Sequence, residues 1–451
     1  MMDGEKIEAL SKGPAASEIT VKGALEKAAL GKGLDIEEAS VLLNIEDAVQ
    51  LAELYKKAGE VKERLFGRRV VLFAPLYLSN YCTNGCVYCG FRNAGTGVSR
   101  KALTPGEVVS EASALEEMGF KRVLLVTGED PRYGVDYIIS CVRAVYEKTG
   151  IRVVHLNAPP MDVTALKELK ASGVAVYQVF QETYHRPTYD RMHPFGRKRD
   201  YPWRLGVMDR ALSAGFKDVG IGVLLGLYDF RFDCLSTIAH SAHLYEKFGT
   251  HAHTISVPRL RPAAGSMLES APHPVTDEEM KKITAVFRLS VPTAGVVVST
   301  RESPALRSAL IHIGATQLSA ASKTNPGGYA KGETSATEQF STDDHRGLEA
   351  VMRSVMEEGL VPSLCTSCYR TGRTGAEFTE RTISGSMEKF CSANAALTLK
   401  EYSRDYAKNG ITGLIEGAVK RSVDEIKDPK MKKALLEKLK ELEKGKRDVF
   451  F

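Results

Sequence analysis

The sequence has no run of apolar residues long enough to cross a bilayer, and residues 1–17 lack the apolar core of a signal peptide. One charge sign does not dominate, because 61 Lys and Arg against 56 Asp and Glu leave a net charge of only +5. Much of this excess falls in residues 427–447, where it is typical of a solvated helix face. We therefore expect a cytoplasmic protein that binds neither a membrane nor nucleic acid.

Cysteine is scarce and unevenly placed, with eight residues in 451. Cys141 and Cys234 stand alone inside apolar periodic segments, where a buried and inert thiol is the common case. The other six form two triplets, at positions 82, 86 and 89 and at positions 365, 368 and 391. Clustered thiols in a long chain without a secretion signal indicate metal binding rather than disulfides.

The first triplet, Cys82, Cys86 and Cys89, directly follows the apolar run of residues 70–78. Three thiols on one loop at a strand end can hold one metal centre, and soft thiolates select iron–sulfur clusters or zinc over hard cations. The spacing matches neither a zinc ribbon nor a bacterial ferredoxin. Three ligands for a four-iron cube leave one iron free to bind a substrate. A small zinc site is the alternative interpretation.

The second triplet is Cys365-Thr366-Ser367-Cys368, followed by 22 residues and then Cys391. A cluster held by these three thiols would also have one iron open to an external ligand. Structural zinc sites often contain a Cys-x-x-Cys pair with a distant Cys, but four ligands normally close them. His345 could supply the fourth ligand, so zinc stays open as an alternative, although the spacing favours a second cluster.

Short β-branched runs alternate with amphipathic helical stretches between residues 68 and 330, with helices expected over residues 105–118, 163–171 and 277–289. Eight β–α units in about 250 residues predict an α/β fold, a parallel (β/α)8 barrel of the TIM type. A doubly wound sheet is the alternative, but no dinucleotide-binding fingerprint follows the first strand. The predicted strands are Val70–Phe73, Val123–Val126, Val153–Leu156, Val174–Tyr177, Val219–Val223, Thr254–Val257, Gly295–Val298 and Gln317–Ala320.

The chain divides into three predicted parts. Residues 1–67 form an N-terminal helical segment, residues 68–330 the barrel, and residues 331–451 a mostly helical C-terminal domain that carries the second triplet. In barrels of this type the chemistry lies where the strands end. Polar residues gather at those ends of the sequence, namely Thr127-Gly128-Glu129, Asn157, Gln181-Glu182-Thr183, Arg259, Arg261, Ser299–Glu302 and Ser322–Asn325.

Tyr88 precedes the third cysteine of the first triplet, and an aromatic residue there is a mark of the radical S-adenosylmethionine (SAM) enzymes, which this segment closely resembles. Residues 127–129 resemble the superfamily motif whose backbone edge receives the SAM amino group. Glu182 and Arg204 match positions that contact SAM, and Arg204 could clamp a carboxylate in a bidentate pair. A strand-end turn and a surface arginine are the alternatives. The resemblance implies a 4Fe-4S cluster and SAM as cofactors.

Nearly end to end, the chain resembles the tyrosine lyases of H-cluster maturation in FeFe hydrogenases. The second triplet, with Tyr369–Gly375, separates this family from the tyrosine lyases of thiamine thiazole synthesis, which lack the auxiliary set. One departure is Phe91, where relatives often have Tyr, and it leaves the ligands untouched. The matching segments are Phe73–Tyr77, Phe180–His185, Asp218–Gly222, His253–Pro262, Ser299–Glu302 and Thr324–Tyr329.

The resemblance implies radical chemistry on L-tyrosine. A 5′-deoxyadenosyl radical from SAM abstracts hydrogen from the amino group, and the Cα–Cβ bond breaks to give p-cresol and dehydroglycine. Dehydroglycine is then degraded to carbon monoxide and cyanide at an auxiliary 4Fe-4S cluster, which carries an extra iron bridged by free cysteine. The product is an iron carbonyl–cyanide precursor of the hydrogenase H-cluster.

The resemblance also assigns residues and partners. His253 matches the histidine that ligates the extra iron, a role that suits a neutral imidazole. Arg301 and Ser299 match the region that holds the tyrosine carboxylate, although Arg301 in a rim salt bridge is the alternative. The expected partners are L-tyrosine, L-cysteine, SAM, an electron donor such as ferredoxin or flavodoxin, and downstream hydrogenase maturation proteins.

Two other functions stay open at this point. A thiamine-type lyase would stop at dehydroglycine and hold about four irons per chain, against about eight or nine for the maturase. A non-enzymatic iron–sulfur carrier or zinc-stabilised scaffold would not cleave SAM. That function leaves the arginines and acids at the strand ends without a role.

Overall fold

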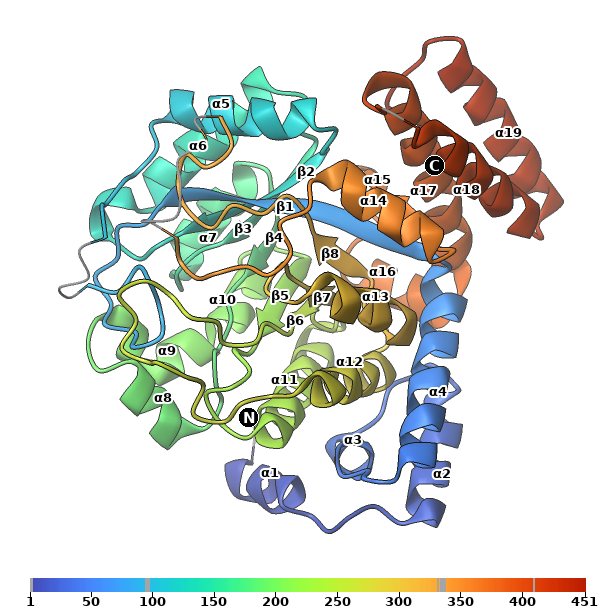
Figure 1. Ribbon diagram of the computed structural model, residues 1–451. Coiled ribbons are helices and arrows are strands. Elements are labelled where there is room, and N and C mark those ends of the chain that lie inside the picture. The colour runs from blue at the N-terminus through green and yellow to red at the C-terminus, as the bar shows by residue number, and fades with distance from the viewer. Residues whose placement is uncertain (1–2, 94–97, 331, 333–337, 409) are drawn as a thin grey trace.

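The computed structural model describes residues 3–93, 98–330, 332, 338–408 and 410–451 (Figure 1). Its centre is a closed barrel of eight parallel strands, in which β1 pairs with both β2 and β8. The predicted (β/α)8 barrel is therefore confirmed, and closure excludes the doubly wound sheet. The strands are β1 (Arg69–Ser79), β2 (Arg122–Thr127), β3 (Val153–Asn157), β4 (Val174–Gln178), β5 (Asp218–Gly222), β6 (Thr254–Ser256), β7 (Gly295–Val298) and β8 (Gln317–Ser319).

The barrel strands are short apolar runs because helices cover them outside and side chains fill them inside. Every residue of β5, β6, β7 and β8 is buried. Small residues on β5 leave interior space for larger neighbours. A Cβ on Gly220 would meet Cγ of Gln178 at 2.6 Å, and one on Gly222 would meet the Ser256 carbonyl oxygen at 2.7 Å. These glycines thus allow Gln178 and Ser256 to occupy the barrel interior.

The outer helices begin at the caps that their sequences indicate. Thr104 and Glu107 form a capping box at the start of α5, and Thr276 and Glu279 form one at the start of α12. The three helices expected from the sequence are confirmed, with bounds that agree to within a residue. The outer helices are α5 (Pro105–Glu117), α6 (Val135–Lys148), α7 (Val163–Ala171), α8 (Arg186–Met192), α9 (Tyr201–Leu205), α10 (Val207–Ser213), α11 (Phe230–Phe248), α12 (Asp277–Ser290) and α13 (Pro304–Ile313).

The N-terminal segment is helical, as predicted, and its last helix packs against the barrel. It comprises α1 (Gly4–Ser11), α2 (Glu18–Ala28), α3 (Ile36–Leu43) and α4 (Ala48–Phe66). Helix α4 packs on α12, α13 and α17 (Ser386–Asp405). It ends at Gly67, whose φ of 65° turns the chain directly into β1. No helix in the described parts of the chain is long and apolar enough to span a bilayer.

The C-terminal region is mostly helical but also adds a ninth strand, which the sequence did not predict. Strand β9 (Val361–Ser363) is parallel to the first residues of β1. Its three residues include Pro362, so neither its length nor its composition indicates a strand. The predicted boundary at residue 331 lies outside the described residues. The remaining elements are α14 (Leu348–Glu357), α15 (Ser367–Thr371), α16 (Ala376–Ile383), α18 (Thr412–Glu425) and α19 (Pro429–Glu443).

Candidate functional site

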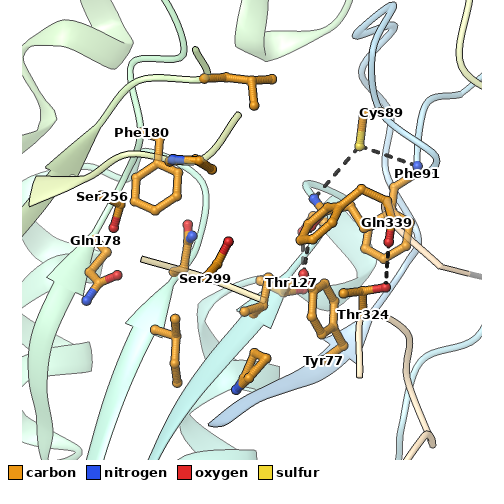
Figure 2. A pocket seen from close by; sticks show the side chains of 18 of the residues that line it. Tyr77, Cys89, Phe91, Thr127, Gln178, Phe180, Ser256, Ser299, Thr324 and Gln339 are labelled. Carbon is orange, nitrogen blue, oxygen red and sulfur yellow. Dashed lines mark hydrogen bonds between the residues drawn. The ribbon is translucent and has the colours of Figure 1, made fainter. Parts of the chain in front are cut away.

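A large cavity, here called the rim cavity, opens among the carboxyl ends of the barrel strands. It encloses about 1610 Å³, counting the part open to solvent. Figure 2 shows Cys89 and Gln339 on one side of it and Gln178, Phe180 and Ser256 on the other. The cavity brings together the candidate residues of the first site, which are Cys82, Cys86, Tyr88, Cys89, Thr127, Gly128, Glu129, Glu182, Arg204, Ser299 and Arg301.

The first three thiols lie on the loop that leaves β1, and hydrogen-bond donors approach two of them. The Phe91 N–H donates to Cys89 Sγ at 3.4 Å, and Asn84 Nδ2 donates to Cys82 Sγ at 3.6 Å. Burial raises the pKa of Cys86 to about 12 and also raises that of Cys89. Such thiols ionise only with a compensating cation, which an iron–sulfur cluster provides when thiolates bind it. The donor set and its N–H contacts therefore fit a cluster.

In the described residues, no three His, Cys, Asp or Glu side chains lie close enough to hold one metal ion. Ligands of a single ion such as zinc must converge on one point. The ligands of a four-iron cube bind separate irons and so need not converge on one point.

The turn after β2 packs directly on the cysteine loop. The Thr83 N–H donates to the Glu129 carbonyl oxygen at 2.8 Å, and Asn84 Nδ2 donates to the Glu129 carboxylate at 2.7 Å. A Cβ on Gly128 would meet the Tyr81 carbonyl oxygen at 2.2 Å, far inside van der Waals contact. Only glycine fits here, and it allows the turn and the loop to share one wall of the cavity.

Glu182 lies at the end of the β4 segment in a strained conformation and between two cations. Its φ of 72° is uncommon for a non-glycine residue. Lys198 Nζ lies 2.6 Å and an Arg204 NH2 3.5 Å from its Oε1. Burial opposes ionisation of this carboxyl, but Lys198 and Arg204 outweigh it and lower the pKa of Glu182. The carboxylate is therefore charged at neutral pH and held at one place in the cavity.

Arg301 is the cation at the other side of the rim cavity. Its guanidinium stacks 3.3 Å above the Phe340 ring and donates to the Arg259 carbonyl oxygen at 3.1 Å. Burial lowers the pKa of Arg301 to about 10, so it stays charged at neutral pH. Ser299, labelled in Figure 2, accepts a hydrogen bond from the Arg301 N–H at 3.4 Å. The geometry leaves a half-buried cation and a hydroxyl at one end of the cavity, a suitable pair for a carboxylate.

Other polar residues predicted at strand ends serve the scaffold instead. Arg259 forms an ion pair with Glu302 and another with Asp277 at 2.8 Å. Arg261 pairs with Asp343 at 2.8 Å and lies 3.5 Å from Glu302. Neither arginine lines the rim cavity, so the charge at this edge is largely neutralised within the wall.

The second triplet lines a separate cavity at the opposite end of the barrel, here called the floor cavity. It encloses about 580 Å³ and lies where β1, β2, β7 and β8 begin. Cys365 follows β9, Cys368 lies on α15 and Cys391 on α17. His253 precedes β6 and therefore joins these cysteines rather than the residues of the rim.

His253 is largely buried, and one of its two ring nitrogens is hydrogen-bonded. Its Nε2 and the Tyr369 hydroxyl are 2.9 Å apart, and its Nδ1 lies 3.4 Å from Asp218 Oδ1. Burial lowers the pKa of His253, so the ring is neutral at physiological pH. A neutral imidazole is the form that binds a metal. His345 is different, because it is exposed, contacts Thr342 Oγ1 at 3.3 Å and does not line the floor cavity.

Two arginines, Arg122 (buried) and Arg69 (half-buried), give the floor cavity a positive charge. An Arg122 NH2 donates to the Cys365 carbonyl oxygen at 2.7 Å. Burial acts against the charge of Arg69, but the thiols of Cys391, Cys368 and Cys365 raise its pKa overall. Burial raises the pKa of Cys368 to about 12. The cations suit a group of negative charge bound to these thiols, such as a thiolate-ligated cluster.

Gln317, at the start of β8, lines both cavities. It pairs with Val297 on β7, and its side chain lies over Gly295, where a Cβ would meet Gln317 Nε2 at 2.3 Å. The Gln317 amide therefore occupies space that any larger residue at 295 would fill. This polar side chain therefore lies between the two ends of the barrel interior.

Sequence reasoning missed several residues of the two cavities. Lys198 lies in the short helix Arg197–Arg199, where three cations in a row resemble a solvated surface. Gln339 Nε2 approaches Cys89 Sγ at 3.8 Å from 250 positions away, and no local pattern indicates that contact. Arg69 and Arg122 begin their strands, at the end of the barrel opposite to the one usually searched for chemistry. Asn84 was detectable, because it stands within the cysteine loop itself.

Comparison with known proteins agrees with this geometry. The model of the radical SAM superfamily matches residues 76–239, and that of the Biotin and Thiamin Synthesis associated domain matches residues 256–361. The barrel, the three-cysteine loop and this match define a radical SAM enzyme, with SAM and a 4Fe-4S cluster as its cofactors. The zinc alternative for the first triplet and the non-enzymatic scaffold are thereby rejected.

Individual similar proteins indicate which group of radical SAM enzymes the chain belongs to. The 2-iminoacetate synthase of Escherichia coli (strain K12) is 36% identical over 341 residues, which are 75% of this chain and 89% of that protein. A crystal structure of HydG, a maturase of the [FeFe]-hydrogenase, superposes with a TM-score of 0.95 at 43% identity and covers 99% of this chain and 98% of its own. The X-ray structure of HydG from Carboxydothermus hydrogenoformans superposes with a TM-score of 0.84 at 34% identity and covers 97% of this chain and 100% of its own. The chain belongs to the radical SAM tyrosine lyases, the family that its motifs indicate.

Proposed function

We propose that this tyrosine lyase acts in the cytoplasm as a maturase of the [FeFe]-hydrogenase and makes carbon monoxide and cyanide for an iron precursor of the H-cluster. The supporting observation is the floor cavity, where Cys365, Cys368, Cys391 and His253 meet at the far end of the barrel from the first triplet. The similarity to the HydG structures covers 99% and 97% of this chain and so includes the region of these cysteines.

At the rim cavity, Cys82, Cys86 and Cys89 would hold the 4Fe-4S cluster. When bound and reduced, the cluster and SAM supply the 5′-deoxyadenosyl radical that initiates cleavage of tyrosine. Tyr88 would close one side of the SAM site, since its hydroxyl is fixed 2.9 Å from His193 Nε2. The turn Thr127–Glu129 would present its backbone edge to the SAM amino group, because Gly128 lets that edge lie against the loop.

The charged residues of the rim cavity would orient the two substrates. Glu182 and Arg204 would hold SAM. The two side chains pair with each other, and Arg204 Nε also donates to the Phe180 carbonyl oxygen at 2.7 Å. Arg301 and Ser299 would hold the tyrosine carboxylate at the other side. Two separate anchors of this kind keep the amino group of tyrosine next to SAM while burial excludes water.

At the floor cavity, the second triplet would hold an auxiliary 4Fe-4S cluster, with His253 as the ligand of an extra iron that L-cysteine bridges. This centre supplies the conversion of dehydroglycine to carbon monoxide and cyanide. Asp218 would orient the His253 ring from the side of Nδ1, and Nε2 would have to exchange its hydrogen bond with Tyr369 for the iron. Arg69 and Arg122 would offset the negative charge of the bound group. Reducing equivalents would come from a ferredoxin or flavodoxin, and downstream maturation proteins would receive the product.

Dehydroglycine would pass from the rim to the floor through the barrel. Gln317 lines both cavities, so its side chain would lie beside the route between them. Its amide can hydrogen-bond the carboxylate of a passing intermediate, while the surrounding barrel keeps out the water that would hydrolyse an imine.

A lyase that stops at dehydroglycine is the second candidate, because the similarity to 2-iminoacetate synthase is 36% over most of the barrel. That similarity covers 75% of this chain, whereas the HydG structure covers 99%. The maturase accounts for the second triplet, which the shorter reaction does not use.

The test replaces Cys365, Cys368 and Cys391 with Ala and supplies the reduced, reconstituted protein with SAM, tyrosine and cysteine under anaerobic conditions. We expect p-cresol to form at the wild-type rate, carbon monoxide to be lost, and iron to fall to about four per chain. Cys141→Ala, which removes a buried thiol outside both triplets, is the control and should keep both products. Unchanged carbon monoxide in the triple variant would reject the role of the floor cavity.

A further inference from the structure

A third cavity, here called the basic cavity, lies beside the floor cavity and has no role in the reaction described above. It encloses about 480 Å³ at the end of the barrel where β3 and β4 begin. Four cationic side chains line it, together with two tyrosines and a threonine. These residues are Arg152, Lys170, Lys217, Arg370, Tyr146, Tyr369 and Thr374.

The four cations exceed the negative charge available to them. Arg370 forms a bidentate pair with Asp448 at 2.6 and 2.8 Å, and Arg152 lies 3.6 Å from the same carboxylate. Across the described parts of the chain, no carboxylate forms an ion pair with Lys170 or Lys217. Burial and, to a smaller extent, the charge of Lys217 lower the pKa of Lys170, and together they outweigh the opposing attraction of Asp218. Two lysines that line one cavity without an ion-pair partner favour binding of an anion there.

One side chain is common to the basic cavity and the floor cavity. Tyr369 lines both cavities and directly follows Cys368. Its hydroxyl is hydrogen-bonded to His253, and its ring lies 5.2 Å from the Arg122 guanidinium. Arg152, Lys217 and Arg370 are exposed, so the basic cavity opens to solvent on its other side. A small molecule bound there would be one tyrosine side chain from the floor cavity.

We propose that the basic cavity binds the carboxylate of free L-cysteine on its way from solvent to the second centre. This inference rests on the proposed function, in which that centre uses cysteine. A small α-amino acid fits the space, its carboxylate matches the unpaired lysines, and the Thr374 hydroxyl and Tyr369 supply polar contacts for the rest of the molecule. The cysteine then reaches the centre from the side opposite to tyrosine and SAM, so the substrates do not compete for one entrance.

The experiment reverses the charge of both lysines with Lys170→Glu and Lys217→Glu in the full-length, reconstituted protein. The control, Lys22→Glu with Lys32→Glu, changes the net charge equally at exposed positions of the N-terminal segment. Carbon monoxide and p-cresol are measured against L-cysteine concentration. We expect the half-saturating cysteine concentration for carbon monoxide to rise by about tenfold in the first variant, with p-cresol unchanged. The control should match the wild type.

Binding of L-cysteine, measured by calorimetry on the same proteins, makes the result independent of turnover. Weaker binding of L-cysteine to the Lys170/Lys217 variant than to the wild type supports the inference. Absence of carbon monoxide from the wild-type reaction would reject only the proposed function and would leave this binding result valid. Equal binding and equal half-saturation in all three proteins would overturn it and leave the basic cavity as a surface for an acidic partner. The single variant Lys217→Gln, at an exposed position, is a second measurement in case the double variant misfolds. We expect it to bind L-cysteine more weakly than the wild type, by a smaller factor than the double variant.

Discussion

Gly128→Ala tests the contact between the turn after β2 and the cysteine loop. The new Cβ would lie 2.2 Å from the Tyr81 carbonyl oxygen and 3.2 Å from Cys82 Cβ. Restoring ordinary contact requires a shift of about 1 Å in backbone on one side or the other, since neither neighbour is the end of a flexible side chain. That strain should cost about 1–3 kcal/mol of stability. A displacement of about 1 Å at a reacting centre can lower the rate on the order of 100-fold.

The assay is 5′-deoxyadenosine formation by reduced, reconstituted protein with SAM and tyrosine, with iron content and thermal midpoint measured on the same sample. We expect a roughly 100-fold lower rate and a modest fall in the midpoint. Gly106→Ala is the matched control, because a Cβ there meets nothing within 4 Å, and it should behave as wild type. Wild-type activity and iron content in Gly128→Ala would refute the packing argument.

Two further predictions concern Arg204 and Asp233. In Arg204→Lys a single ammonium cannot contact both the Phe180 carbonyl oxygen and Glu182, so the KM for SAM in 5′-deoxyadenosine formation should rise roughly tenfold; an unchanged KM would contradict this role. Burial raises the pKa of Asp233 to about 7. Between about pH 4 and pH 7 the folded state therefore holds a proton that the unfolded state has released. The free energy of unfolding of the wild type should fall as pH rises across this range and then level off. The Asp233→Asn variant mimics the protonated form. In chemical denaturation its free energy of unfolding should rise relative to that of the wild type by at most about 1.4 kcal/mol per pH unit across that range. Parallel pH profiles of the two proteins would contradict the assignment.

The barrel was predictable because its signal is local. Most strands are β-branched runs between turn residues, and runs such as Val123–Val126 and Gly295–Val298 carry that pattern without help from distant parts of the chain. Strand β9 was not predictable. Its three residues are a strand only because the start of β1 offers them a partner, and that partner lies almost 300 positions earlier.

The candidate site was predictable where chemistry is concentrated in short motifs. The first triplet and Gly128 converge in the rim cavity, as their positions after β1 and β2 imply. The polar support around them comes from distant segments, and its residue types are ordinary on a surface. Lys198 is the clearest case, since only the fold turns it toward Glu182. Residues on loops of that kind need coordinates rather than patterns.

Strand β1 is longer than the other strands of the barrel, and Figure 1 shows it crossing the barrel. Its end, from Ala74 to Ser79, pairs with β2, but its start, from Arg69 to Val71, pairs with β9 instead. The C-terminal region therefore completes the hydrogen bonding of the barrel itself. A chain shortened before residue 361 would leave the first residues of β1 with bare amide and carbonyl groups on one side, an edge that recruits other chains. Loss of the tail should consequently produce self-association, and not merely an enzyme with half its chemistry.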